Sequence, residues 1–253
     1  FYAAILYQAG VYTGFIAGFF ILPDSAQLLF WTASLYVMSL LLFTNKEKQI
    51  GYWILLGLLI GLATLSKVHG LFLWAGFGAY LLFTNPKQLF SGSFILAVSI
   101  TLVCLAPILY WNVVYDFITY RFHSERVTHT GIDAASFTSE LIGEVLYQNP
   151  FVYILMAAAV VAIKKISFQQ KNSGRWLLWM SVPLILIFWM VALFNPTLPH
   201  WSGPAFIPLM MLAGIYMDQK KLSWPIYLVR AAFALVFSIL LFLLNVVQKY
   251  PGN

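Results

Sequence analysis

Short polar stretches interrupt an otherwise apolar sequence, and two of them hold residues that suit acid–base or phosphate chemistry. Asp24 follows a proline, and its carboxylate could face a cavity beside a phosphate site. Lys67 lies in a short turn, where its ammonium group could meet a lipid phosphate. Each residue also has a structural interpretation. Asp24 could cap the helix predicted to start near Ser25, and Lys67 could extend to lipid headgroups.

A third stretch is the most highly charged part of the sequence and contains Arg121, His123, Glu125 and Arg126. On a helix, His123 and Arg126 share a face. The forked guanidinium group suits a phosphate, and an imidazole can bind phosphate, carry a proton or hold a metal. His123 and Glu125 are candidate ligands of a divalent metal, although two ligands do not define a site. The same spacing also describes a solvated helix that pairs its own charges.

Three further side chains are candidates for contact with a substrate. His69 follows Lys67 by two residues, and His200 and Trp201 lie in the irregular stretch NPTLPHWSGP. Either ring of the last pair could pack against a sugar. The alternative for Trp201 is a place in the aromatic belt at a membrane surface.

Composition predicts an all-α fold of membrane-spanning helices. The chain is 62% hydrophobic and 9% charged, far from the balance of soluble domains. Apolar runs long enough to cross a bilayer, or nearly so, recur throughout. About nine spans are predicted, over 1–22, 25–43, 51–66, 70–84, 92–110, 151–163, 176–194, 204–217 and 225–247. The first could be broken around Gly10 and Gly14.

Charge is sorted between the connections. Most lysines and arginines lie in 44–49, 85–88, 164–175 and 217–221, which the positive-inside rule places in the cytoplasm. The candidate site residues lie in the alternate connections, so they share the outer face. The net charge of +6 is explained by this topology, and no nucleic-acid partner is predicted.

The segment 107–150 is the only long connection, and two juxtamembrane helices are predicted in it. In the second helix, an apolar stripe holds Phe137, Leu141, Ile142, Val145 and Leu146, with Glu140 and Glu144 off the stripe. This pattern is typical of an amphipathic helix at the membrane interface.

Several of these stretches, taken in order, resemble a known family. FFILPDSAQLLFWTASLYVMSLLLF (19–43), GLLIGLATLSKVHGLFL (57–73), PILYWNVVYDFITYRFHSERV (107–127) and LPHWSGPAFIPL (198–209) are similar to the polyprenyl-phosphate-sugar glycosyltransferases of family 39. That family includes protein O-mannosyltransferases and lipid A aminoarabinose transferases, which have the membrane-embedded GT-C fold. The motifs together cover most of the chain.

The resemblance implies transfer of a sugar from a polyprenyl-phosphate donor to a lipid, glycan or protein acceptor on the outer, periplasmic face of a bacterial plasma membrane. It gives Asp24 an auxiliary catalytic role, and it assigns the donor phosphate to Lys67, Arg121, His123 and Arg126. It also places the main catalytic carboxylate upstream of Phe1. Residues 1–253 are therefore expected to be one module without its N-terminal part, and to be inactive alone.

Two other classes of protein remain open. A transporter or flippase would show charges within its spans and repeated halves, whereas charges here lie at the ends of spans. A glycan polymerase or ligase would also use arginine and histidine on the outer face, and the sequence separates it poorly from a transferase.

Overall fold

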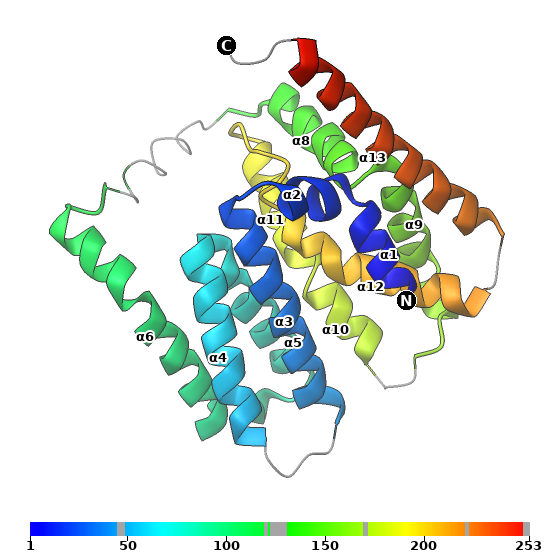
Figure 1. Ribbon diagram of the computed structural model, residues 1–253. Helices are drawn as coiled ribbons and strands as arrows, with labels where there is room; N and C mark the ends of the chain where they lie inside the picture. The colour runs from blue at the N-terminus through cyan, green and yellow to red at the C-terminus, as the bar shows by residue number, and fades with distance from the viewer. Residues whose placement is uncertain (45–48, 119–120, 122–130, 169–171, 221–222, 250–253) are drawn as a thin grey trace.

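The computed structural model describes residues 1–44, 49–118, 121, 131–168, 172–220 and 223–249, and the regular structure in these ranges is entirely helical (Figure 1). The α-helices are α1 (Tyr2–Ala9), α2 (Ala17–Phe19), α3 (Pro23–Phe43), α4 (Gln49–Ser66), α5 (Phe72–Thr84), α6 (Gly92–Val114), α8 (Ala134–Tyr147), α9 (Pro150–Val161), α10 (Ser173–Trp179), α11 (Val182–Ala192), α12 (Phe206–Lys220) and α13 (Trp224–Lys249). A π-helix covers Val11–Ile16, and 3-10 helices cover Val68–Leu71, Pro86–Phe90, Ile163–Lys165 and Gly203–Ala205.

The all-α prediction is confirmed, but the predicted number of about nine spans is not. In the described ranges, five segments are long and apolar enough to cross a membrane, or six if α8 and α9 form one broken span. These two helices meet at an angle of 99°. The other predicted spans are shorter than a bilayer requires. For example, α9 has 12 residues and α12 has 15.

Two boundaries differ from the sequence prediction. The run 1–22 is broken at Gly10, as expected, but it continues as a π-helix that buries Tyr12. The predicted loop 107–150 begins too early, because α6 continues through Pro107 to Val114. A proline removes one helical hydrogen bond without always ending a helix.

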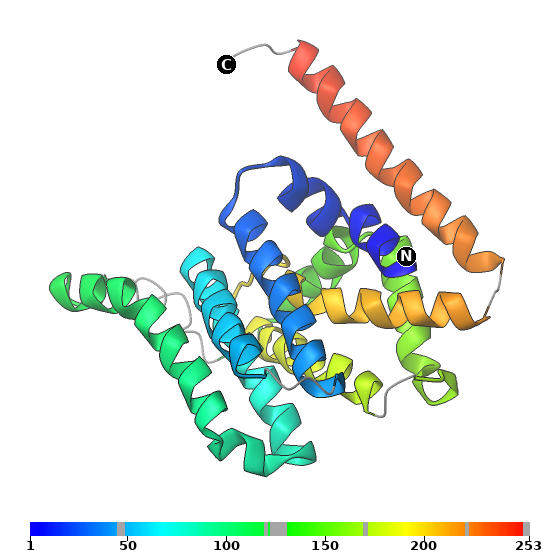
Figure 2. The ribbon, with the colours of Figure 1, turned by 60° about the horizontal axis from the view of Figure 1, so that its bottom comes forward.

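The helices form two packed groups that meet in the middle of the molecule. In one group α3 packs on α4 and α4 on α6, and in the other α12 packs on α1 and α9. α10 joins the groups through contacts with α5 and α12. α6 lies at one edge of the molecule, whereas α13 lies at the opposite edge (Figures 1 and 2).

The chain alternates direction between α3 and α4, so the start of α3 and the end of α4 lie at the same end of the molecule, here called the site end. Asp24 is in the first turn of α3, and Lys67 directly follows α4. The aromatic residues 200–201 reach the same place from the connection between α11 and α12. The fold therefore gathers residues from three separate connections.

Glycines allow α4 to approach α6 closely. A Cβ added at Gly57 would lie 2.4 Å from the carbonyl oxygen of Ala97, whereas one added at Gly51 of the same helix would meet nothing within 4 Å. We predict that Gly57→Leu lowers the free energy of unfolding by about 1–3 kcal/mol, the usual cost of overpacking. Gly51→Leu is the control. Thermal unfolding in detergent measures both, and equal melting temperatures would contradict the prediction.

Candidate functional site

An aspartate and a lysine form the centre of the site end. Lys67 Nζ donates to Asp24 Oδ1 at 2.8 Å, and the hydroxyl of Tyr12 donates to the same oxygen at 2.6 Å. Asp24 is 8% exposed. Its place in the first turn of α3 also suits a negative charge, because the helix dipole is positive there. The structure thus holds a carboxylate out of bulk water beside one cation.

The predicted capping role of Asp24 is wrong. Leu22 is the N-cap of α3, and Asp24 lies inside the helix. Ser25 Oγ accepts from the Leu22 amide at 3.4 Å and thereby takes part in the capping. The carboxylate of Asp24 is instead directed to Tyr12 and Lys67. The proline at the first helical position supplies the fixed backbone angle that starts the helix.

The bonding of the pair leaves groups available for a ligand. Both hydrogen bonds of the Asp24 carboxylate go to Oδ1, so Oδ2 accepts none from the described residues. An ammonium group has three donors, and one of those of Lys67 is used. The backbone of Lys67 is held by Gln27, whose Nε2 donates to its carbonyl oxygen at 3.4 Å. The ammonium group of Lys67 could therefore bind an anion while its ion pair with Asp24 stays intact.

The charges of Asp24 and Lys67 both act on the imidazole ring of His200. Burial lowers the pKa of His200 from its ordinary value, the positive charge of Lys67 lowers it further, and Asp24 opposes the shift. A lowered pKa keeps the imidazole neutral at pH 7, so that one ring nitrogen can accept a hydrogen bond. The ring centroid of His200 is 6.1 Å from that of Tyr147.

Trp201 and His69 belong to one aromatic cluster at the site end. Their ring centroids are 6.1 Å apart, and the ring of Phe188 lies 5.3 Å from His69 and 5.9 Å from Trp201. Trp201 is half-buried and packs on the hydrophobic core. The structure therefore brings together five of the predicted site residues: Asp24, Lys67, His69, His200 and Trp201.

Of the four candidates in the charged third stretch, the structure describes only Arg121. Arg121 is 63% exposed, and its Nη2 lies 4.0 Å from Asp116 Oδ2. α6, which precedes this stretch, lies at the edge of the molecule in both views (Figures 1 and 2). His123, Glu125 and Arg126 lie outside the described residues. In the part of the chain that is described, no three His, Cys, Asp or Glu side chains are grouped to hold a metal ion.

Two buried glutamates on α8 were missed as site residues. Glu140 is 1% exposed and Glu144 is fully buried, whereas Ile142 and Leu146 are each 56% exposed. The polar face of α8 thus faces protein, and the apolar stripe faces outward. The sequence did carry a signal. Two acids spaced by four residues beside apolar runs are costly against lipid and are usually directed to a polar interior.

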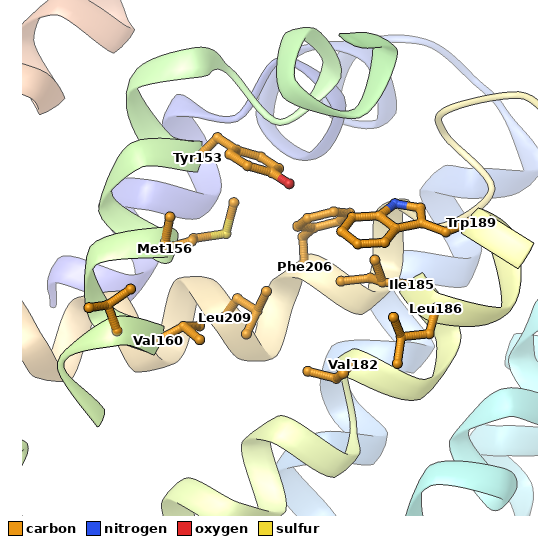
Figure 3. Close-up of a pocket in the computed structure, with 11 residues that line it drawn as sticks. Tyr153, Met156, Val160, Val182, Ile185, Leu186, Trp189, Phe206 and Leu209 are labelled. Carbon is orange, nitrogen blue, oxygen red and sulfur yellow. The ribbon is translucent and has the colours of Figure 1, made fainter. Parts of the chain in front are cut away.

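An apolar cavity of about 290 Å³ lies between α9, α11 and α12. Its lining is aliphatic and aromatic, with Tyr153 and Trp189 as its polar members. Figure 3 shows the Tyr153 hydroxyl and the Trp189 indole nitrogen at the same end of the cavity. The Trp189 nitrogen donates to Glu144 Oε2 at 2.7 Å. Such a lining suits a hydrocarbon chain and offers few partners to a sugar.

Comparisons with known proteins agree with this arrangement. Residues 1–111 match the family model of dolichyl-phosphate-mannose-protein mannosyltransferases. The chain is also 26% identical over 184 residues to the lipid A galacturonosyltransferase RgtD of Rhizobium johnstonii. That alignment covers 72% of this chain and 38% of the relative, so the chain spans well under half the relative's length. No solved structure matches. The chain is therefore similar to glycosyltransferases, and its apolar helices are those of a multi-pass membrane protein.

Proposed function

We propose that the full-length protein transfers a sugar from a polyprenyl-phosphate donor to an acceptor at the periplasmic face of the bacterial plasma membrane. The observation that carries this proposal is the Asp24–Lys67 pair, in which a cation with unused donors is held at the end of two apolar helices. A donor whose prenyl chain lies in the membrane would present its phosphate near the ends of such helices.

The chemistry of transfer accounts for the cation. When the bond between the sugar and the phosphate breaks, negative charge develops on the leaving phosphate. A cation held in place before the reaction stabilises that charge. We assign this contact to Lys67. Asp24 holds the ammonium group of Lys67 in position, which agrees with an auxiliary role. Arg126, His123 and Arg121 remain proposed second contacts to the phosphate, and His123 with Glu125 a proposed metal site.

We propose a lipid as the first acceptor to test, with glycans and proteins after it. The relative that covers more of the chain is named for transfer to lipid A, whereas the family model is named for transfer to protein. His69, His200 and Trp201 are the proposed contacts to the transferred sugar, since they lie around Lys67 and offer ring faces.

The placement of buried charge favours an enzyme over a transporter. Asp24 lies at the start of its helix, and Glu144 bonds to Ser202 in the connection that brings His200 to the site. A transporter would carry such groups near the middle of the membrane.

The test uses the full-length protein in liposomes that contain a polyprenyl-phosphate donor with a labelled sugar and a lipid acceptor. The expected result is label on the acceptor and release of polyprenyl phosphate in equal amounts. Lys67→Ala is the inactive comparison. Movement of the labelled donor across the bilayer without transfer would contradict the proposal and favour a flippase.

A further inference from the structure

One face of α8 contacts the segment 197–202 at four positions. Glu140, Gly143, Glu144 and Tyr147 are spaced by three, one and three positions, so they share a helix face. Thr197 donates to Glu140 Oε2 at 2.6 Å, and Ser202 donates to Glu144 Oε1 at 2.5 Å.

Between these two bonds the packing is close. A Cβ added at Gly143 would lie 2.1 Å from Cγ of Pro199, so only glycine lets the segment approach the helix this closely. The Tyr147 ring lies beside that of His200. The four contacts therefore enclose the Pro199-His200-Trp201 tripeptide on its α8 side.

The other side of the segment faces the Asp24–Lys67 pair. His200 interacts electrostatically with both charges, and Trp201 packs near His69. A Cβ at Gly203 would lie 2.3 Å from Cε1 of Tyr12, the residue that donates to Asp24. The segment thus fills the space between α8 and the proposed phosphate site.

Glu144 joins three elements at the centre of this contact. It is fully buried, and its two oxygens accept from Ser202 of the segment and Trp189 of α11. The corner that follows α8 is itself fixed, because Asn149 Nδ2 donates to the carbonyl oxygens of Ala9 and Ala232 at 2.9 and 3.0 Å. α8 is therefore the anchored partner, and the segment is held on it.

We propose that Glu144 is a positioning residue which, together with Glu140, holds His200 and Trp201 against the Asp24–Lys67 site. The effect of this positioning on catalysis rests on the proposed function. Glu144 bonds to Ser202 and Trp189 rather than to Asp24 or Lys67, so its effect passes through Ser202 and the segment. The two oxygens of a carboxyl group can accept from two different elements at once, which suits this task.

The test compares variants that remove one side-chain donor or acceptor group at a time in the full-length protein. Ser202→Ala and Thr197→Val each remove a hydroxyl donor, and Thr197→Ser keeps one. Ser202→Ala also removes the weaker bond from the Ser202 hydroxyl to the carbonyl oxygen of Pro199 at 3.3 Å. Ser139→Ala is the matched control, since Ser139 is exposed on the same helix. Glu144→Ala removes the central acceptor, and Ser202→Ala still tests the inference if Glu144→Ala does not fold.

The first measurement is hydrogen–deuterium exchange of the peptide 195–205, which needs no catalysis. The amides of Trp201 and Gly203 donate within the segment to Leu198 and His200, so their exchange reports its order. We expect exchange to be about 2- to 10-fold faster in Ser202→Ala, in line with the net contribution of a hydrogen bond. Thr197→Val should behave similarly, whereas Thr197→Ser and Ser139→Ala should match the wild type. Peptides of α3 and α12 should exchange unchanged.

The second measurement is kcat/KM for sugar transfer, which should fall in the same variants and recover in Thr197→Ser. Unchanged exchange in Ser202→Ala and Thr197→Val would overturn the inference while leaving the proposed function intact. Faster exchange with full transfer activity would overturn it as well. A wild-type protein without transfer would contradict the proposed function, and the positioning role would fall with it.

Discussion

Lys67→Ala in the full-length protein is expected to reduce sugar transfer by about 100- to 1,000-fold, the usual cost of removing one preorganised donor to a developing negative charge. The ammonium group lies 2.8 Å from Asp24 Oδ1, and the Lys67 side chain is only 17% exposed, so water replaces the cation poorly. The measurement is the initial rate of transfer from a polyprenyl-phosphate donor.

The control for this variant is Lys87→Ala, which removes an exposed lysine from the 3-10 helix Pro86–Phe90. It should leave transfer unchanged. Lys67→Ala also leaves the buried carboxylate of Asp24 without its cation, which can destabilise a protein by several kcal/mol. Combining Lys67→Met with Asp24→Asn removes both charges and should restore the melting temperature without restoring transfer. Full activity in Lys67→Ala would contradict the assignment of the phosphate contact.

Asp24→Asn is expected to lower transfer by about 100-fold through misplacement of Lys67, since small displacements of a reacting group cost that much. An amide oxygen can still accept from Tyr12 or from Lys67, but it carries no charge to attract the ammonium group. The free energy of unfolding should fall by about 1–3 kcal/mol, because a buried donor loses its charged acceptor. Asp24→Ala should cost more, since it also leaves the Tyr12 hydroxyl unpaired.

Asp218→Asn is the matched control, because Asp218 is exposed near the end of α12. The informative comparison is the double variant of Asp24 and Lys67. Residues that act as a unit show non-additive effects, so the double variant should lose little more activity than Lys67→Ala alone. Additive losses would show that Asp24 acts independently of Lys67 and would contradict its positioning role.

The sequence was sufficient to predict the ends of helices that carry Asp24 and Lys67. Each residue adjoins a long apolar run. Two consecutive spans run in opposite directions, so the start of the first lies at the same end as the finish of the second. The pairing itself required the fold. Tyr12 completes the environment of Asp24 from within a π-helix, and nothing in the run 1–22 indicates that its hydroxyl faces the carboxylate.

The number of spans was overestimated for a physical reason. Hydropathy measures how well a segment tolerates lipid, and a helix buried among other helices has the same composition as one that crosses the bilayer. α12 is short, yet nearly all of its first ten residues are buried in the protein. α9 is more apolar than α12, yet it ends after 12 residues.

Composition and charge sorting by themselves determined an all-α chain with its acid–base residues in the connections, because charge is excluded from lipid and apolar helices satisfy their own backbone. Only the tertiary structure decided which face of α8 is buried. An amphipathic helix buries whichever face finds partners, and the hydroxyls of Thr197 and Ser202 gave Glu140 and Glu144 partners inside the protein. Its apolar face was thereby left outward, the reverse of the arrangement on a water-soluble surface.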